Sequence, residues 1–171
     1  PSRPGGYALD LDSTRLLHED GHQEGVEVGY TRVGTKPCLH PLLAVLSEVR
    51  LVAAFWLRPG HSGCANNGVS FFLDLWDNLP RHVRVRVVRA DSGFCNGVLL
   101  ALWQGLKLHF VVAAHLSQPI QRLIQKEISW QDTELEGTQV AELNYQEDGW
   151  PASARLIVIR HRLADKKGRT G

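Results

Sequence analysis

Two stretches of the sequence pair a strand pattern with an aspartate at the place where the strand should end. Residues 7–12 (YALDLD) alternate apolar and polar side chains with the period of two typical of a β-strand, and Ser13 breaks the alternation after Asp12. Residues 83–91 (VRVRVVRAD) form a β-branched run that also terminates in an aspartate, Asp91. Burying a carboxylate is costly unless it is hydrogen-bonded, paired or bound to a cation. We therefore expect Asp12 and Asp91 to mark two strand ends around which the fold is organised.

Composition and charge exclude several classes of protein. The chain of 171 residues is long enough for one domain with a core, or for a core plus a small insertion, and its 43% hydrophobic and 22% charged residues are typical of a globular protein. The net charge of +1 gives no general attraction to nucleic acid. No apolar run approaches the roughly 20 residues that span a bilayer, so no membrane partner is expected. The cysteines form no CxxC pair, which favours a reducing, cytoplasmic compartment, and the lack of methionine, even at residue 1, indicates an excerpt from a longer reading frame.

The periodicity of the other segments predicts an alternation of strands and helices. Apolar runs of strand length cover residues 39–47, 49–57, 83–90, 108–114, 138–145 and 155–162. Helical patterns cover residues 69–79, 97–106 and 119–126. The glycine-rich residues 18–35 are expected to form a loop with a short edge strand near residues 26–33.

This order of elements is the layout of a ribonuclease H-like mixed α/β sheet, in which three antiparallel strands precede alternating strands and helices. We expect residues 1–127 to form this core and residues 128–171 to form a small β-rich insertion segment and a basic tail. In such a core the first and fourth strands lie side by side. Asp12 and Asp91 should therefore meet at one edge of the sheet.

Two carboxylates from separate strands suit two-metal phosphoryl transfer, in which a pair of divalent cations clamps the attacking and leaving oxygens. Mg²⁺ and Mn²⁺ prefer oxygen ligands, so Asp12 and Asp91 are candidate catalytic residues and candidate metal ligands. The alternative is structural, because an aspartate beside a serine also forms turns with its own backbone. The residues alone leave both interpretations open.

Several short motifs point to one family. The segments DLDSTRLL, QEGVEVGY, HPLLAVLSE, LRPGHSGCANNG, VRVVRADSGF and HFVVAAHLSQPIQRLI follow one another between about Tyr7 and Ile124. In order and spacing they resemble the catalytic domain of DDE-type insertion-sequence transposases. Asp12 lies in the match to the family's first acidic motif, DST, and Asp91 in the match to the second, RADSGF. The resemblance implies a ribonuclease H-like fold with a β-rich insertion, and two acids that bind Mg²⁺ or Mn²⁺.

The resemblance also implies an activity, which is metal-dependent DNA strand cleavage and strand transfer by phosphoryl transfer. The implied partner is double-stranded DNA, both that of the transposon ends and that of the target. A homodimer on DNA is one possible assembly. The implied location is the bacterial cytoplasm, in association with the nucleoid.

The family's third acid, a glutamate on a helix after the insertion, has no counterpart that we assign in this chain. We assign the role of third acid to none of the glutamates in or near the insertion: Glu127, Glu134, Glu136, Glu142 and Glu147. We therefore expect a catalytic core that is incomplete in this chain, which leaves enzymatic activity open. One alternative is a non-catalytic transposase remnant that binds DNA or a protein partner. Another is a ribonuclease H-like nuclease with a different substrate.

Other polar residues have weaker assignments. Asp10 lies on the same strand face as Asp12 and is a lesser candidate for a site carboxylate. Arginines can supply salt-sensitive phosphate contacts, although such side chains often extend into solvent instead. The candidates for nucleic-acid binding are Arg89, Arg155, Arg160 and Arg162.

The sequence supports neither a zinc site nor a base-stacking surface. Structural zinc needs four ligands at paired spacings. The available residues lie on separate predicted elements and are better explained as buried cysteines and surface histidines: Cys38, His40, His61, Cys64 and Cys95. Trp130 and Trp150 bracket an acidic segment and are assigned to the insertion's own small core rather than to base stacking.

Overall fold

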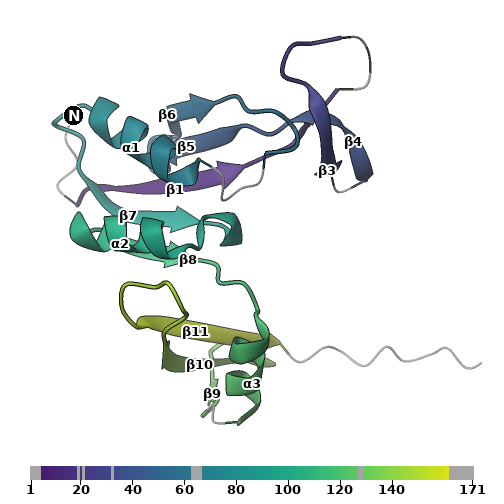
Figure 1. Cartoon of the computed structure of the whole chain (residues 1–171). Coiled ribbons are helices and arrows are strands. Elements are labelled where there is room, and N and C mark those ends of the chain that lie inside the picture. Colours follow the sequence, from purple (N-terminus) through teal and green to yellow (C-terminus); the bar gives the residue numbers. More distant parts are fainter. Residues whose placement is uncertain are drawn as a thin grey trace, which may run out of the picture. The chain divides into compact units, whose positions relative to one another are not determined.

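The computed structural model describes residues 5–18, 20, 22–31, 33–62, 67–126 and 129–161 (Figure 1). The chain consists of two compact units, Pro1–His115 and Leu116–Gly171. The boundary between the units precedes helix α3 (Gln118–Lys126), whereas the sequence predicts a domain boundary after residue 127. No helix among the described residues is long and apolar enough to cross a bilayer.

A five-stranded mixed sheet forms the centre of the first unit. Its strands lie in the order β6-β5-β1-β7-β8. Their bounds are β1 (Tyr7–Ser13), β5 (Leu42–Leu46), β6 (Leu51–Trp56), β7 (Val85–Ala90) and β8 (His109–Val112). β5 is antiparallel to both β1 and β6, and β7 is parallel to both β1 and β8. The fold class is therefore mixed α/β, and the first and fourth strands predicted for the core sheet are neighbours.

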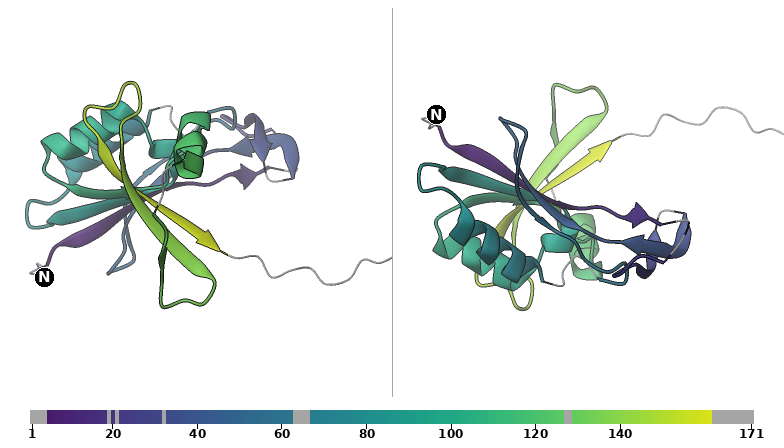
Figure 2. Two further views of the ribbon diagram at one scale, coloured as in Figure 1. Left: turned by 90° about the horizontal axis from the view of Figure 1, so that it is seen from below. Right: turned by 90° about the horizontal axis from the view of Figure 1, so that it is seen from above.

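Two helices, α1 (Gly68–Asn78) and α2 (Gly97–Gly105), cover one face of this sheet (Figure 2). Leu9 and Leu11 of β1 are buried, and so are Phe71 and Phe72 of α1 and Trp103 of α2. Phe72 of α1 and Trp103 of α2 meet edge to face, with ring centroids 5.8 Å apart. The alternate residues of β1 point to the opposite face, which is where Asp10 and Asp12 lie.

A second, three-stranded sheet also belongs to the first unit, and the sequence predicts only part of it. It has the order β2-β4-β3, with β2 (Leu16–Leu17), β3 (Glu27–Thr31) and β4 (Gly34–Leu39). β3 falls within the predicted edge strand, but no strand is predicted over residues 34–38, the first two of which belong to the predicted loop. Its sequence GTKPCL has little β-propensity, and pairing with β3 prevails over that local preference.

The strand predicted over residues 39–47 is interrupted at His40 and Pro41. There the backbone pairs with another segment, because the amide of His40 donates to the carbonyl oxygen of Arg58 at 2.8 Å. The side chain of Arg58 donates in return, from Nε to the His40 carbonyl oxygen at 3.0 Å. The predicted strand is therefore two strands in different sheets, and residues 58–62 are packed against the junction.

The second unit contains helix α3 and a small antiparallel sheet. Its elements are α3 (Gln118–Lys126), β9 (Gln131–Asp132), β10 (Thr138–Tyr145) and β11 (Ala154–His161), and the sheet order is β11-β10-β9. Strand β10 has the predicted bounds, and β11 begins one residue early. Tyr145 and Trp150 meet edge to face at 5.7 Å, as expected if Trp150 belongs to this unit's own core.

Candidate active site at the ends of two parallel strands

Asp12 and Asp91 lie at the carboxyl ends of adjacent parallel strands. The last residue pair in register between β1 and β7 is Leu11 with Ala90, and each aspartate is the next residue along its strand. Both aspartates are exposed. The structure thus brings together two acids that are far apart in the sequence, at the edge of the sheet where the prediction put them.

Each aspartate uses one carboxylate oxygen to accept a hydrogen bond from the backbone that follows it. Asp12 Oδ1 accepts a hydrogen bond from the amide of Ser13 at 2.7 Å. Asp91 Oδ1 accepts from the amide of Gly93 at 2.9 Å and so caps the short 3₁₀ helix Ser92–Phe94. The turn-forming interpretation is therefore correct for Asp91, but it does not exclude a second role. Each carboxylate has a second oxygen that can serve as a ligand.

A cavity of about 660 Å³ opens beside Asp91. The ends of β1 and β7 form one wall and the three-stranded sheet forms the other, and the lining mixes hydroxyl, charged, aromatic and aliphatic side chains. The lining residues that bear on function are Ser13, Thr14, Arg15, Tyr30, His40 and Asp91. Arg15 Nη1 donates to the carbonyl oxygen of Gly60 at 3.0 Å, and this hydrogen bond fixes the position of the guanidinium at the cavity.

His40 lines the same cavity but is only 1% exposed. Burial is the largest influence on its imidazole and lowers the pKa, while the hydrogen bond to the Ser62 carbonyl opposes it. The charges of Arg15 and Arg58 lower the pKa by smaller amounts and that of Asp91 raises it, so that the net shift is downward. His40 Nδ1 lies 2.5 Å from the carbonyl oxygen of Ser62. The neutral ring therefore carries its proton on Nδ1 and donates it to Ser62, which ties residues 58–62 to the cavity wall.

Acid should destabilise the first unit through His40. Because the folded pKa lies below the ordinary value of about 6.5, the unfolded chain takes up this proton first as the pH falls, so stability present above that value is lost below it. We expect the Tm to fall between about pH 7.5 and about pH 5.5, and to fall less steeply in His40→Gln. The exposed His82 provides the control substitution His82→Gln, which should keep the native slope. An unchanged slope in His40→Gln would contradict the assignment.

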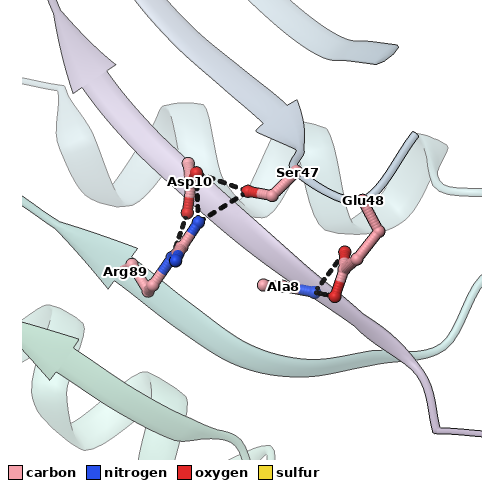
Figure 3. Close-up of polar contacts among 5 residues, drawn as sticks. All are labelled: Ala8, Asp10, Ser47, Glu48 and Arg89. Carbon is pink, nitrogen blue, oxygen red and sulfur yellow. Dashed lines mark hydrogen bonds and ion pairs between the residues drawn. The ribbon is translucent and has the colours of Figure 1, made fainter. Parts of the chain in front are cut away.

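Asp10 and Arg89 form a bidentate ion pair across β1 and β7 (Figure 3). Arg89 Nε donates to Asp10 Oδ1 and Nη2 donates to Oδ2, each at 2.6 Å. Ser47, which follows β5, accepts from Arg89 Nη2 at 2.8 Å and donates to Asp10. The Arg89 hydrogen bond lowers the pKa of Asp10, and Asp10 raises that of Arg89. The carboxylate of Asp10 therefore binds Arg89 and is not directed toward Asp12. Contact between Arg89 and DNA stays a prediction.

Two of the other predicted DNA-binding arginines, Arg155 and Arg160, lie on β11 and have partners on β10. Arg155 Nη2 donates to Glu142 Oε1 at 2.9 Å. Arg160 donates to Gln139 Oε1 and its guanidinium lies 3.9 Å from the centroid of the Trp130 ring. These contacts leave parts of both guanidinium groups on the surface, so phosphate binding stays a prediction. Arg162 lies outside the described residues.

Within the described ranges, no group of three or more His, Cys, Asp or Glu side chains is arranged to hold a metal ion. Cys38 is buried and Cys95 is half-buried, while Cys64 falls outside the described residues. The two aspartates still suit a hard cation, because Mg²⁺ commonly uses one or two protein carboxylates and completes its shell with water and substrate phosphate.

Sequence reasoning missed the Ser47 contact and the cavity residues Arg15 and Tyr30. The cavity depends on β4, which was not predicted. For the ion pair a signal was present, because Asp10 precedes Asp12 by two residues and Arg89 precedes Asp91 by two residues. In a parallel pair with the two acids side by side, those two residues also face each other.

Comparison with known proteins places these features in a family. The sequence matches the family described as transposase DDE domain group 1 over residues 2–168. A search of curated proteins gives no match.

Among solved structures, the chain is similar to a piggyBac transposase, seen by cryo-EM in a synaptic complex with hairpin DNA, with 13% identity and a TM-score of 0.48. That similarity covers 89% of this chain and 33% of the piggyBac chain, so this chain spans 33% of that transposase's length. YeaZ from Pseudomonas aeruginosa has 14% identity and a TM-score of 0.34, over 93% of this chain and 70% of YeaZ. Since the family match extends over nearly the whole sequence, the chain belongs to the transposase DDE domain group 1 family.

Proposed function

We propose that this chain forms the catalytic core of a DDE transposase, with a ribonuclease H-like sheet and with Asp12 and Asp91 as its metal-binding acids. The observation that carries the proposal is the position of the two acids, each one residue beyond the last in-register pair of β1 and β7. The strand order β6-β5-β1-β7-β8, in which three antiparallel strands adjoin two parallel ones, supports the ribonuclease H-like assignment. Family membership supports the transposase activity.

The expected cofactor is Mg²⁺ or Mn²⁺. When bound, such a cation would lower the pKa of an attacking hydroxyl and neutralise charge on the phosphate in the transition state. Asp12 and Asp91 would hold it through the carboxylate oxygens that do not accept the backbone hydrogen bonds. The hydrogen bonds from the Ser13 and Gly93 amides fix the orientation of the two carboxylates, so little ordering is needed when the cation binds.

The cavity beside Asp91 is where a DNA strand would enter the site. Its volume of about 660 Å³ is in the range of small-molecule binding sites and is sufficient for a nucleotide. The Arg15 guanidinium has five N–H donors and, among the described residues, gives one of them to Gly60; we expect another to donate to a phosphate oxygen of the DNA. Tyr30, which is 75% exposed at the cavity wall, presents an aromatic face on which a base can stack.

The proposed reaction consists of two in-line displacements at phosphorus. In the first, a water oxygen attacks the phosphorus at a transposon end and loses a proton to solvent, while the bond to the 3′ oxygen breaks. That oxygen takes up a proton from solvent and leaves as a free 3′-hydroxyl, and the phosphate stays on the 5′ end of the other fragment. In the second, this hydroxyl loses its proton to solvent and attacks a phosphorus of the target DNA, which displaces a 3′ oxygen of the target strand. The expected substrates are the transposon ends and the target, and a homodimer on DNA is one assembly that the proposal admits.

Magnesium should strengthen binding of double-stranded DNA to this protein. A cation held by Asp12 and Asp91 also takes substrate phosphate oxygens as ligands, so affinity for a labelled duplex should rise several-fold as MgCl₂ is added at constant ionic strength. Fluorescence anisotropy measures the change, with KCl added in place of MgCl₂ as the control. Affinity that is independent of Mg²⁺ would favour a non-catalytic DNA-binding remnant instead.

A further inference from the structure

The Asp10, Arg89 and Ser47 cluster closes a ring of hydrogen bonds on the sheet face opposite the two helices. Figure 3 shows the guanidinium of Arg89 reaching from β7 to the carboxylate of Asp10 on β1, with Ser47 beside both. A planar guanidinium matches a carboxylate in this two-pronged arrangement, which fixes the direction of both side chains. The cluster therefore constrains geometry as well as charge.

The position of the cluster along the strands is significant. The pairing of β1 with β7 shifts register between Tyr7 and Ala8, so the ladder is irregular at its amino-terminal end. Asp10 and Arg89 are directly paired after that irregularity, two residues before Asp12 and Asp91. A slip of one residue in a strand turns every side chain to the other face. A rigid cross-strand contact at this point therefore protects the relative position of the two acids.

The turn after β5 attaches a third strand to the same point. The amide of Ser47 donates to the carbonyl oxygen of Ala8 at 3.0 Å. The carboxylate of Glu48 accepts from the amide of Ala8, with its two oxygens at 3.0 and 3.2 Å. Ser47 and Glu48 thus hold β1 next to the irregular step (Figure 3). The side-chain contacts of Ser47 then extend this support to β7 through Arg89.

We infer that Asp10, Arg89 and Ser47 are positioning residues that hold the carboxyl ends of β1 and β7 in the register needed for Asp12 and Asp91 to share a cation. They act through the two aspartates and are not ligands themselves. The inference rests on the proposed function, because it assigns the cluster to the cation site of that function.

Two substitutions with opposite changes of charge test the inference. Asp10→Asn removes a negative charge near the site and Arg89→Gln removes a positive one. If the cluster acted only through its electric field, Asp10→Asn would weaken Mn²⁺ binding and Arg89→Gln would strengthen it. If the cluster positions the aspartates, both substitutions weaken Mn²⁺ binding, by about tenfold, as is typical when groups that orient metal ligands are lost. Arg89→Lys, which keeps the charge without the planar fork, should be intermediate.

Mn²⁺ affinity is measured by electron paramagnetic resonance, well below the Tm of each variant, and hydrogen exchange is followed at the amides of Asp12 and Asp91. Glu142→Gln, which breaks the comparable Arg155–Glu142 ion pair in the second unit, should leave both readouts at the native values. Faster exchange and weaker Mn²⁺ binding in both cluster variants support the inference. Native Mn²⁺ affinity in Arg89→Gln, or an increase, overturns it and leaves the proposed function standing. Failure of the unsubstituted protein to bind Mn²⁺ overturns both.

Discussion

Asp91→Asn should reduce Mn²⁺-dependent DNA cleavage by about a thousandfold, and Asp12→Asn should do the same. The cation's stabilisation of transition-state charge is worth several kcal/mol, and each ~1.4 kcal/mol corresponds to a factor of ten in rate. Asparagine keeps the Oδ1 atom that accepts from the Gly93 amide in one case and from the Ser13 amide in the other. Both backbone contacts should therefore survive, and the loss can be assigned to the missing charge rather than to misfolding.

The control for this prediction is Asp132→Asn in the second unit. Asp132 is exposed and its Oδ1 accepts a hydrogen bond from Gln139 at 2.8 Å, which asparagine can also accept. Nicking of supercoiled plasmid DNA by the unsubstituted protein and the three variants is compared at equal Mn²⁺ concentration. Cleavage by Asp91→Asn at the native rate would mean that Asp91 only forms its turn.

Gly60→Ala should destabilise the first unit by about 2–3 kcal/mol, toward the upper end for an inserted methyl group. A Cβ at Gly60 would lie 2.2 Å from the carbonyl oxygen of Glu27 and 2.4 Å from that of Cys38. Both atoms belong to the paired backbones of β3 and β4, so they cannot move apart without breaking that ladder. Gly29 faces the same contact, since its Cβ would lie 2.1 Å from the Gly60 carbonyl oxygen.

Urea unfolding measures this effect, with Gly105→Ala as the matched control. Gly105 ends helix α2 and a Cβ there meets no atom within 4 Å, so alanine should stabilise by about 0.5–1 kcal/mol through its higher helix propensity. The Gly60 carbonyl also holds Arg15, so Gly60→Ala should weaken DNA binding as well. A Gly60→Ala protein as stable as the native one would show that residues 58–62 do not pack against β3 and β4 in this way.

The position of the acids could be predicted because it depends on local patterns and one topological rule. Alternating residues in one strand and a β-branched run in another each ended at an aspartate. In a sheet where the first and fourth strands are parallel neighbours, those ends must lie together. The structure confirms this placement, while the metal-binding role that we attach to it is a proposal.

The wall of the cavity could not be predicted, because it depends on contacts between distant segments. Lys36 and Pro37 have low β-propensity, so propensity does not predict β4, which is a strand because it pairs with β3. Likewise the break at His40 follows from hydrogen bonds with Arg58, eighteen positions later in the chain. The ion pair of Arg89 is a different case, because it follows from the strand register. Arg89 lies opposite Asp10 in the parallel ladder of β1 and β7, and the sequence of β7 alone does not show this.

The most direct test of the account is a titration of Mn²⁺ into the unsubstituted protein and into the double variant Asp12→Asn/Asp91→Asn, followed by isothermal calorimetry. Two neighbouring carboxylates at the ends of β1 and β7 should bind Mn²⁺ in the unsubstituted protein, and the double variant should show no binding under the same conditions. Equal binding by the two proteins would contradict the assignment of this sheet edge as the catalytic centre.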